Sequence, residues 1–239
     1  PKQLSRESKK FFYSQIQKGA RGRDYELALL WLSDCGIIHR VARVASPEIP
    51  LKFFEDTGSF KVFLSDVGLL SYLCGASQQH IVAGAELLKE YRGALAEQFV
   101  LQELVAQTPW TPYYWTSHSG SAEVDFLVQG AKGGIPIEVK AGINLKAKSL
   151  KVFMEKYGSA LALRLSLAEH KTSQLPYKDG TTGSIVDVPL YACATFTAVA
   201  DALCPPTAAT QELDTWALSS VPKNPHPVPQ HQTTTCNEA

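Results

Sequence analysis

The sequence predicts an α/β fold from one pattern, and two further features predict a folded protein with a core and without a membrane span. Segments with the apolar periodicity of helices alternate with short apolar segments that are typical of strands. The 239 residues are 45% apolar and 19% charged, which is ordinary for a folded protein with a substantial core. The apolar runs all fall short of the roughly 18 residues that a membrane-spanning helix needs. We therefore expect a folded α/β protein that does not enter a membrane.

The charge and the cysteine content narrow the class of protein further. Lys and Arg together number 23, as do Asp and Glu, which excludes a uniformly basic nucleic-acid binder and an acidic tail protein. The five cysteines are widely spaced and include no C-x-x-C pair, which argues against a disulfide framework or a zinc ribbon. Reduced cysteines are the rule inside the cell, so we expect a cytoplasmic protein.

Residues 1–84 are expected to form a basic N-terminal segment and a small α+β module. The first 23 residues hold seven Lys or Arg and one acid. The expected elements that follow are a helix at 25–35, strands at 37–44 and 60–64, and a short helix at 67–74. This order predicts a winged-helix-like module. Residues 24–84 hold four basic and seven acidic residues, which favours a connector or a protein-interaction role over DNA binding.

Residues 85–204 are expected to form a second domain with the order α-β-β-β-α-β, followed by a last strand and a short helix. Its expected elements are a long helix at 86–107, strands at 113–116, 123–128 and 135–140, a helix at 144–157, strands at 161–165 and 185–190, and a short helix at 196–203. Pro189 indicates that the last strand lies at a sheet edge. Residues 205–239 hold six prolines and few apolar residues, so we expect a disordered tail.

Two acidic residues are expected to face each other in the hairpin formed by the second and third strands of this domain. A four-residue loop centred between Ala131 and Lys132 places Asp125 opposite Glu138, with Cβ atoms about 5 Å apart. Side chains alternate along a strand, so Val124 and Phe126 are expected on one face and Asp125 on the other. Lys140 is expected on the same face as Glu138. Adjacent carboxylates repel, and a divalent cation between them would remove that repulsion.

A third acid lies on the long helix. Glu97 falls in register with an apolar stripe, where a carboxylate is costly. One interpretation is that the helix packs over the sheet and directs Glu97 to the same site as the hairpin acids. The alternative is a glutamate at the flank of the helix with no functional role.

These residues carry a family resemblance. Glu97, Asp125 and the tripeptide Glu138-Val139-Lys140 resemble the PD-(D/E)XK nuclease core of the RecB type, which implies a restriction-endonuclease-like fold. The segments GALAEQFVLQEL, YYWTSHSGSAEVDFLVQ and IPIEVKAG resemble the C-terminal domain of unknown function of predicted bacterial and archaeal AAA+ ATPases. The N-terminal segments PKQLSRESKKFFYS, DYELALLWLSDCGIIHRV and FKVFLSDVGLL resemble the winged-helix-like linker of the same proteins. The resemblance covers residues 1–192.

The resemblance implies Mg²⁺-dependent, or Mn²⁺-dependent, hydrolysis of nucleic-acid phosphodiesters. Asp125, Glu138 and the carbonyl of Val139 would bind the metal, and Glu97 would hold a metal-bound water. Lys140 would orient the attacking water or stabilise the developing negative charge. The chain contains no G-x-x-x-x-G-K-[ST] loop and begins with proline, so we expect a piece of a longer protein whose ATPase domain lies outside it.

Two alternatives remain open. The hairpin charges could form a buried ion-pair network that only orients the strands, or the fold could be a degenerate, catalytically inactive module that binds DNA or a protein for the ATPase. Lys146, Lys148 and Lys151 follow the Glu-x-Lys strand closely and would contact nucleic-acid phosphates, most simply those of DNA, or else form an ordinary solvated helix face.

Overall fold

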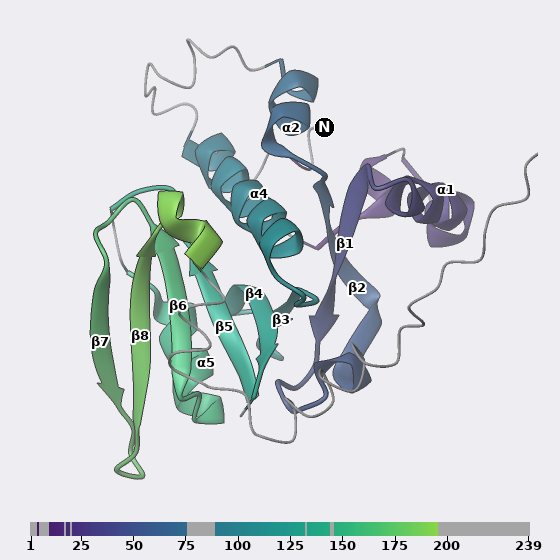
Figure 1. Ribbon diagram of the computed structural model, residues 1–239. Coiled ribbons are helices and arrows are strands. Elements are labelled where there is room, and N and C mark those ends of the chain that lie inside the picture. The colour runs from purple at the N-terminus through teal and green to yellow at the C-terminus, as the bar shows by residue number, and fades with distance from the viewer. Residues whose placement is uncertain are drawn as a thin grey trace, which may run out of the picture. The chain divides into compact units, whose positions relative to one another are not determined.

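The computed structural model of the chain describes residues 4, 10–16, 18–19, 21–75, 89–131, 133–143 and 146–195 (Figure 1). These residues form a mixed α/β structure around one eight-stranded sheet with the order β2-β1-β3-β4-β5-β6-β8-β7. The strands are β1 (Ile38–Val44), β2 (Glu55–Leu64), β3 (Tyr113–Thr116), β4 (Glu123–Gly130), β5 (Gly133–Val139), β6 (Leu161–Ser166), β7 (Lys171–Pro176) and β8 (Thr182–Pro189). The helices are α1 (Gly22–Asp34), α2 (Val67–Leu73), α4 (Lys89–Gln107) and α5 (Lys148–Tyr157), with 3₁₀ turns η1 (Tyr13–Gln15), η2 (Leu51–Phe54) and η4 (Leu190–Thr195).

The two strands of the expected N-terminal module belong to the same sheet as the rest of the protein. β1 pairs with β2 in antiparallel orientation and with β3 in parallel orientation, through Arg43 and Tyr114 and through Val44 and Trp115. The expected boundary at residue 84 therefore does not separate two sheets. Pairing with β1 gives the short strand β3 a neighbour on both sides, so its backbone groups are not left at an exposed edge.

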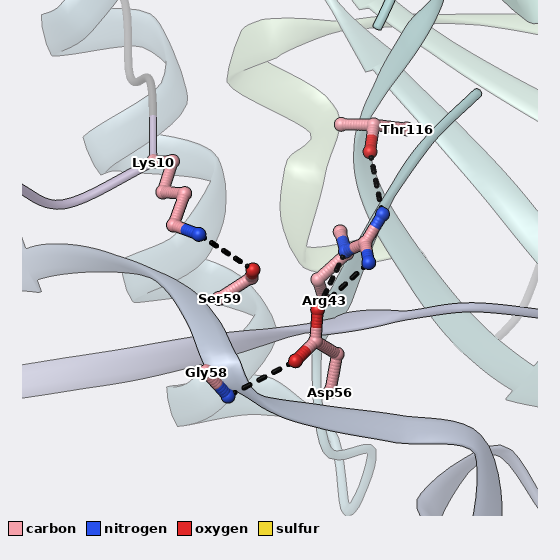
Figure 2. Close-up of polar contacts among 6 residues, drawn as sticks. All are labelled: Lys10, Arg43, Asp56, Gly58, Ser59 and Thr116. Atoms are coloured by element: carbon pink, nitrogen blue, oxygen red, sulfur yellow. Dashed lines mark hydrogen bonds and ion pairs between the residues drawn. The ribbon is translucent and has the colours of Figure 1, made fainter. Parts of the chain in front are cut away.

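Arg43 reinforces this junction between β1, β2 and β3. Its Nε and Nη2 atoms lie 3.1 and 2.7 Å from Oδ2 of Asp56 on β2, and its Nη1 donates to Oγ1 of Thr116 on β3 at 3.2 Å (Figure 2). Asp56 in turn accepts a hydrogen bond from the backbone N–H of Gly58 at 3.0 Å. One guanidinium thus connects three neighbouring strands.

The two long helices of the second segment cover opposite faces of the sheet. On β6, Leu163 belongs to the main apolar cluster with Leu101 of α4, whereas Ala162 packs with Leu150 of α5. Successive residues of a strand point to opposite faces, so α4 and α5 lie on different sides. The sheet is therefore buried on both faces in this region, which explains why its strands are almost continuously apolar.

Helix α4 also holds the edge of the sheet at β2. The side chain of Gln98 is buried and makes two hydrogen bonds to Leu64, accepting from its N–H at 2.9 Å and donating to its carbonyl at 2.6 Å. Further along the helix, Gln102 accepts from the N–H of Val67 at 3.2 Å. Gln98 thus satisfies backbone groups that the edge strand β2 would otherwise present to solvent or to another chain, and Gln102 satisfies an N–H in the first turn of α2.

Several boundaries differ from those expected. The strand β7 was not predicted, because KTSQLP is polar and mostly exposed and so lacks an apolar pattern. β7 occupies the sheet edge, so the prediction that the Pro189 strand lies at the edge was wrong; Pro189 is the last residue of β8. The helix expected at 144–157 begins at Lys148 and ends at Tyr157, and the φ of 62° at Gly158 permits the left-handed cap that follows it. The helix expected at 196–203 and the tail expected at 205–239 lie outside the described residues.

Candidate functional site

The hairpin between β4 and β5 has the register that the sequence predicts. Pairing runs from Phe126 and Ile137 at one end to Gly130 and Gly133 at the turn. The pairing of Gly130 with Gly133 leaves two residues between the strands, rather than the expected four. One further step along the same register places Asp125 opposite Glu138.

A β-bulge in the pairing of β4 with β3 changes the direction of the side chains around Asp125. Tyr113 pairs with Leu127 but Trp115 pairs with Val124, so two residues of β4, Asp125 and Phe126, oppose the single residue between them on β3. An extra residue of this kind redirects the side chains beside it. The expectation that Val124 shares a face with Phe126 was therefore wrong, and Val124 packs instead in one apolar cluster with Leu127 and Trp115.

The Asp125 carboxylate lies where the regular pairing of β4 and β5 ends. Its Oδ2 accepts a hydrogen bond from the backbone N–H of Val139 at 2.8 Å. This N–H would otherwise need a backbone acceptor on β4. The hydrogen bond fixes one carboxylate oxygen, and Asp125 as a whole is half-buried.

Glu138 is the most perturbed acid in the hairpin. Its side chain is 6% exposed, and its Oε1 lies 2.5 Å from Nζ of Lys140, which is 34% exposed. Its second oxygen, Oε2, is buried and has no hydrogen-bond partner within the described part of the chain. Burial raises the pKa of Glu138 to about 7, with a further increase from the Asp125 charge that Lys140 and Lys61 partly offset.

Lys61 is a central residue of this cluster that the sequence did not indicate. It lies on β2, its side chain is completely buried, and its Nζ is 2.6 Å from Oε1 of Glu123 on β4. The same ammonium lies 5.0 Å from the ring centroid of Tyr114. The available signal was a lysine inside the apolar run Phe60–Leu64, where every residue proves to be buried.

The acids around Lys61 determine its charge state. Burial alone would lower the pKa of Lys61, but the negative charges of Glu97, Glu123 and Asp125 outweigh this effect and raise it above its ordinary value. Glu97, which is 6% exposed on α4, provides the largest of these attractions. The surrounding acids therefore favour the charged form of Lys61.

The structure thus groups Glu97, Asp125, Glu138 and Lys140 into one electrostatic cluster and adds Lys61 and Glu123 to it. The other predicted contact residues, Lys146, Lys148 and Lys151, are all exposed. Lys148 and Lys151 lie on α5, across the sheet from the helix that carries Glu97.

The acids do not form a preassembled three-ligand metal site. Among the residues that the structure describes, no three His, Cys, Asp or Glu side chains converge in a way that could hold a metal ion. Glu97, the third predicted acid, stabilises the charge of the buried Lys61. Asp125 and the free oxygen of Glu138 form a pair of hard oxygen donors, which suits Mg²⁺ because this ion keeps several waters and needs only one or two carboxylates.

Two family models match the chain. Residues 92–191 match a domain of unknown function, DUF4143. Residues 1–80 match a second domain of unknown function, DUF8612. No curated protein and no solved structure matches the chain. The DUF4143 segment contains most of α4, including Glu97, and all strands from β3 to β8, whereas Lys61 lies in the DUF8612 segment, so both segments contribute to the acid cluster.

Membrane insertion finds no support in the described helices. None of them combines the length and the apolar character that crossing a bilayer requires.

Proposed function

We propose that the β4–β5 hairpin is an Mg²⁺-dependent site that cleaves phosphodiester bonds of nucleic acid, in a domain of the PD-(D/E)XK type. The observation that carries the proposal is the pair formed by Asp125 and Glu138, with the buried Oε2 of Glu138 left without a partner in the described residues. A buried carboxylate oxygen without a partner is unfavourable, and a bound cation would satisfy it.

Each residue has a distinct role in this proposal. Asp125, held by the N–H of Val139, offers its second oxygen to the metal, and Glu138 offers Oε2. Lys140 is close enough to Glu138 to be oriented by it and exposed enough to meet a phosphate or the attacking water. The bound Mg²⁺ would supply the positive charge that stabilises the transition state and lowers the pKa of water.

The arrangement of elements is consistent with this proposal. The order α4-β3-β4-β5-α5-β6 corresponds to the α-β-β-β-α-β order expected for a restriction-endonuclease-like core. The exposed Lys146, Lys148 and Lys151 would contact backbone phosphates and so favour DNA without regard to sequence. In this proposal the chain serves an AAA+ ATPase as its C-terminal part.

A second candidate is a catalytically inactive module that binds DNA or a protein for the same ATPase. It is favoured by one observation, the buried ammonium of Lys61, which already compensates part of the negative charge. The two candidates differ in whether the cluster takes up a divalent cation.

Titration calorimetry with Mn²⁺ tests the first candidate. We expect the parent chain to bind Mn²⁺ and Asp125→Asn and Glu138→Gln to lose that binding, while Asp179→Asn, which alters an exposed acid in the β7–β8 turn, binds as the parent does. Incubation of single- and double-stranded DNA with the protein in Mg²⁺, compared with EDTA, then distinguishes a nuclease from a module that binds DNA without cleaving it. A parent chain that binds no Mn²⁺ would contradict the first candidate and favour the second.

A further inference from the structure

We propose that Lys61 takes the place of a second metal ion in the cluster, so that the site holds one divalent cation and not two. This inference rests on the proposed function, because it concerns the metal stoichiometry of the same site. Many phosphodiester-cleaving sites use two metal ions a few ångströms apart. Here one of the two positive charges would belong to the protein itself.

The position of Lys61 is built into the core. Its strand, β2, is separated from β4 by β1 and β3, and its side chain reaches Glu123 on β4 at 2.6 Å. The side chain is completely buried, so water does not solvate the ammonium. A charge in such a place is tolerated only when opposite charges and hydrogen bonds surround it. The surrounding acids are therefore partners that the fold requires.

The charges of the cluster leave room for one divalent cation. The cluster contains four carboxylates, those of Glu97, Glu123, Asp125 and Glu138, and two ammonium groups, those of Lys61 and Lys140. A bound cation keeps Glu138 ionised, and four negative and two positive charges then leave an excess of two negative charges. One divalent cation balances this excess, whereas two would leave the cluster positively charged around the buried Lys61.

The acids also divide into two sets, one that stabilises the ammonium of Lys61 and one that is left to bind the metal ion. Glu123 is in direct ionic contact with Lys61, and Glu97 gives it the largest electrostatic stabilisation. Asp125 and Glu138 remain as the donors for a metal ion.

The number of Mn²⁺ ions bound per chain, measured by calorimetry on the full chain, tests the inference. We expect one Mn²⁺ for the parent and two for Lys61→Met, because the loss of the ammonium frees Glu97 and Glu123 as ligands. The double variant Lys61→Met/Glu97→Gln, which lacks one of these ligands, should return to one. Lys52→Met removes an exposed lysine from η2 and should bind one Mn²⁺ with the affinity of the parent.

A second variant decides the question if Lys61→Met does not show cooperative thermal unfolding. Glu97→Gln keeps Lys61 and removes one negative charge, so we expect a Mn²⁺ affinity about tenfold lower with the stoichiometry still at one. An unchanged affinity in Glu97→Gln, or a single ion of unchanged affinity in folded Lys61→Met, would overturn the inference and leave the proposed function intact. Two ions in the parent would do the same. No binding by the parent would instead overturn the proposed function.

Discussion

Arg164 and Asp187 form a two-point ion pair in the interior of the sheet. Nε of Arg164 lies 2.6 Å from Oδ1 of Asp187, and Nη2 lies 3.0 Å from Oδ2. The two residues are register partners on β6 and β8, and the register partner of Arg164 on β5 is Glu138. Lys171 follows opposite Asp187 on β7. Charges of alternating sign therefore cross four neighbouring strands, and the candidate site lies at one end of this row.

Breaking the Arg164–Asp187 pair should destabilise the protein strongly. Arg164→Met leaves the buried Asp187 without its counter-charge, and we expect a loss of about 3–5 kcal/mol in the free energy of unfolding, measured with urea. Arg40→Met, which breaks an ion pair with the exposed Glu26, should lose no more than about 1 kcal/mol from that pair. In Arg164→Met/Asp187→Leu the stability should recover most of the loss. Equal stabilities of Arg164→Met and the parent would contradict this assignment.

The side-chain amide of Gln98 should contribute more to the stability of the protein than its position on an amphipathic helix indicates. Gln98→Leu leaves the N–H and the carbonyl of Leu64 without a side-chain partner, which should cost about 2–6 kcal/mol at roughly 1–3 kcal/mol for each buried group. The matched control is Gln107→Leu in the exposed last turn of α4, for which a change below about 0.5 kcal/mol is expected. Thermal unfolding followed by circular dichroism would compare the two variants. Similar melting temperatures would show that the hydrogen bonds of Gln98 to Leu64 do not stabilise the protein.

The packing of α5 on the sheet depends on Phe153. Its ring is fully buried and meets Trp115 edge-to-face, with centroids 5.1 Å apart. Phe153→Ala should therefore lower the free energy of unfolding by about 3–5 kcal/mol. Its neighbour Val152 is 45% exposed, so Val152→Ala should change it by less than about 1 kcal/mol. The prediction fails if the two variants unfold at the same urea concentration.

Glu138 should make the stability of the metal-free protein depend on pH. Its pKa is raised to about 7 in the folded state, from an ordinary value of 4.5, so the folded protein holds this proton more tightly than the unfolded chain does. The contribution to stability is therefore greatest below about pH 4.5 and declines as the pH rises to about 7, by up to about 3 kcal/mol. Urea unfolding in EDTA at several pH values would measure this decline. In Glu138→Gln the decline should be absent, and an identical pH profile in both proteins would refute the prediction.

Local sequence pattern was sufficient to predict the pairing register of the hairpin that carries the candidate site. The glycine-containing turn and the apolar alternation on both sides of it determine the pairing of Phe126 with Ile137, and the structure confirms this register. The same is true of the end of α5, since Gly158 has the positive φ that the helix end requires. Both features depend on residues that are close in the chain.

The features that sequence pattern missed depend on residues far apart in the chain. The pairing of β1 with β3 joins Arg43 to Tyr114, and neither strand contains a signal for that partner. The bulge at Asp125 arises from the fit between β3 and β4, and apolar alternation cannot reveal it. Lys61 could not be assigned to the acid cluster, because its role depends on the position of β2 beside α4 and β1.

The parallel pairing of β1 with β3, here called the seam, constrains which parts of this chain can be lost during evolution. Residues 1–80 and 92–191 match two separate family models, yet the seam runs between them. A descendant that kept only the second segment would expose the edge of β3, an open template for aggregation, and would leave Glu97 and Glu123 without Lys61. The two segments are therefore expected to be inherited together, as halves of a single folding unit.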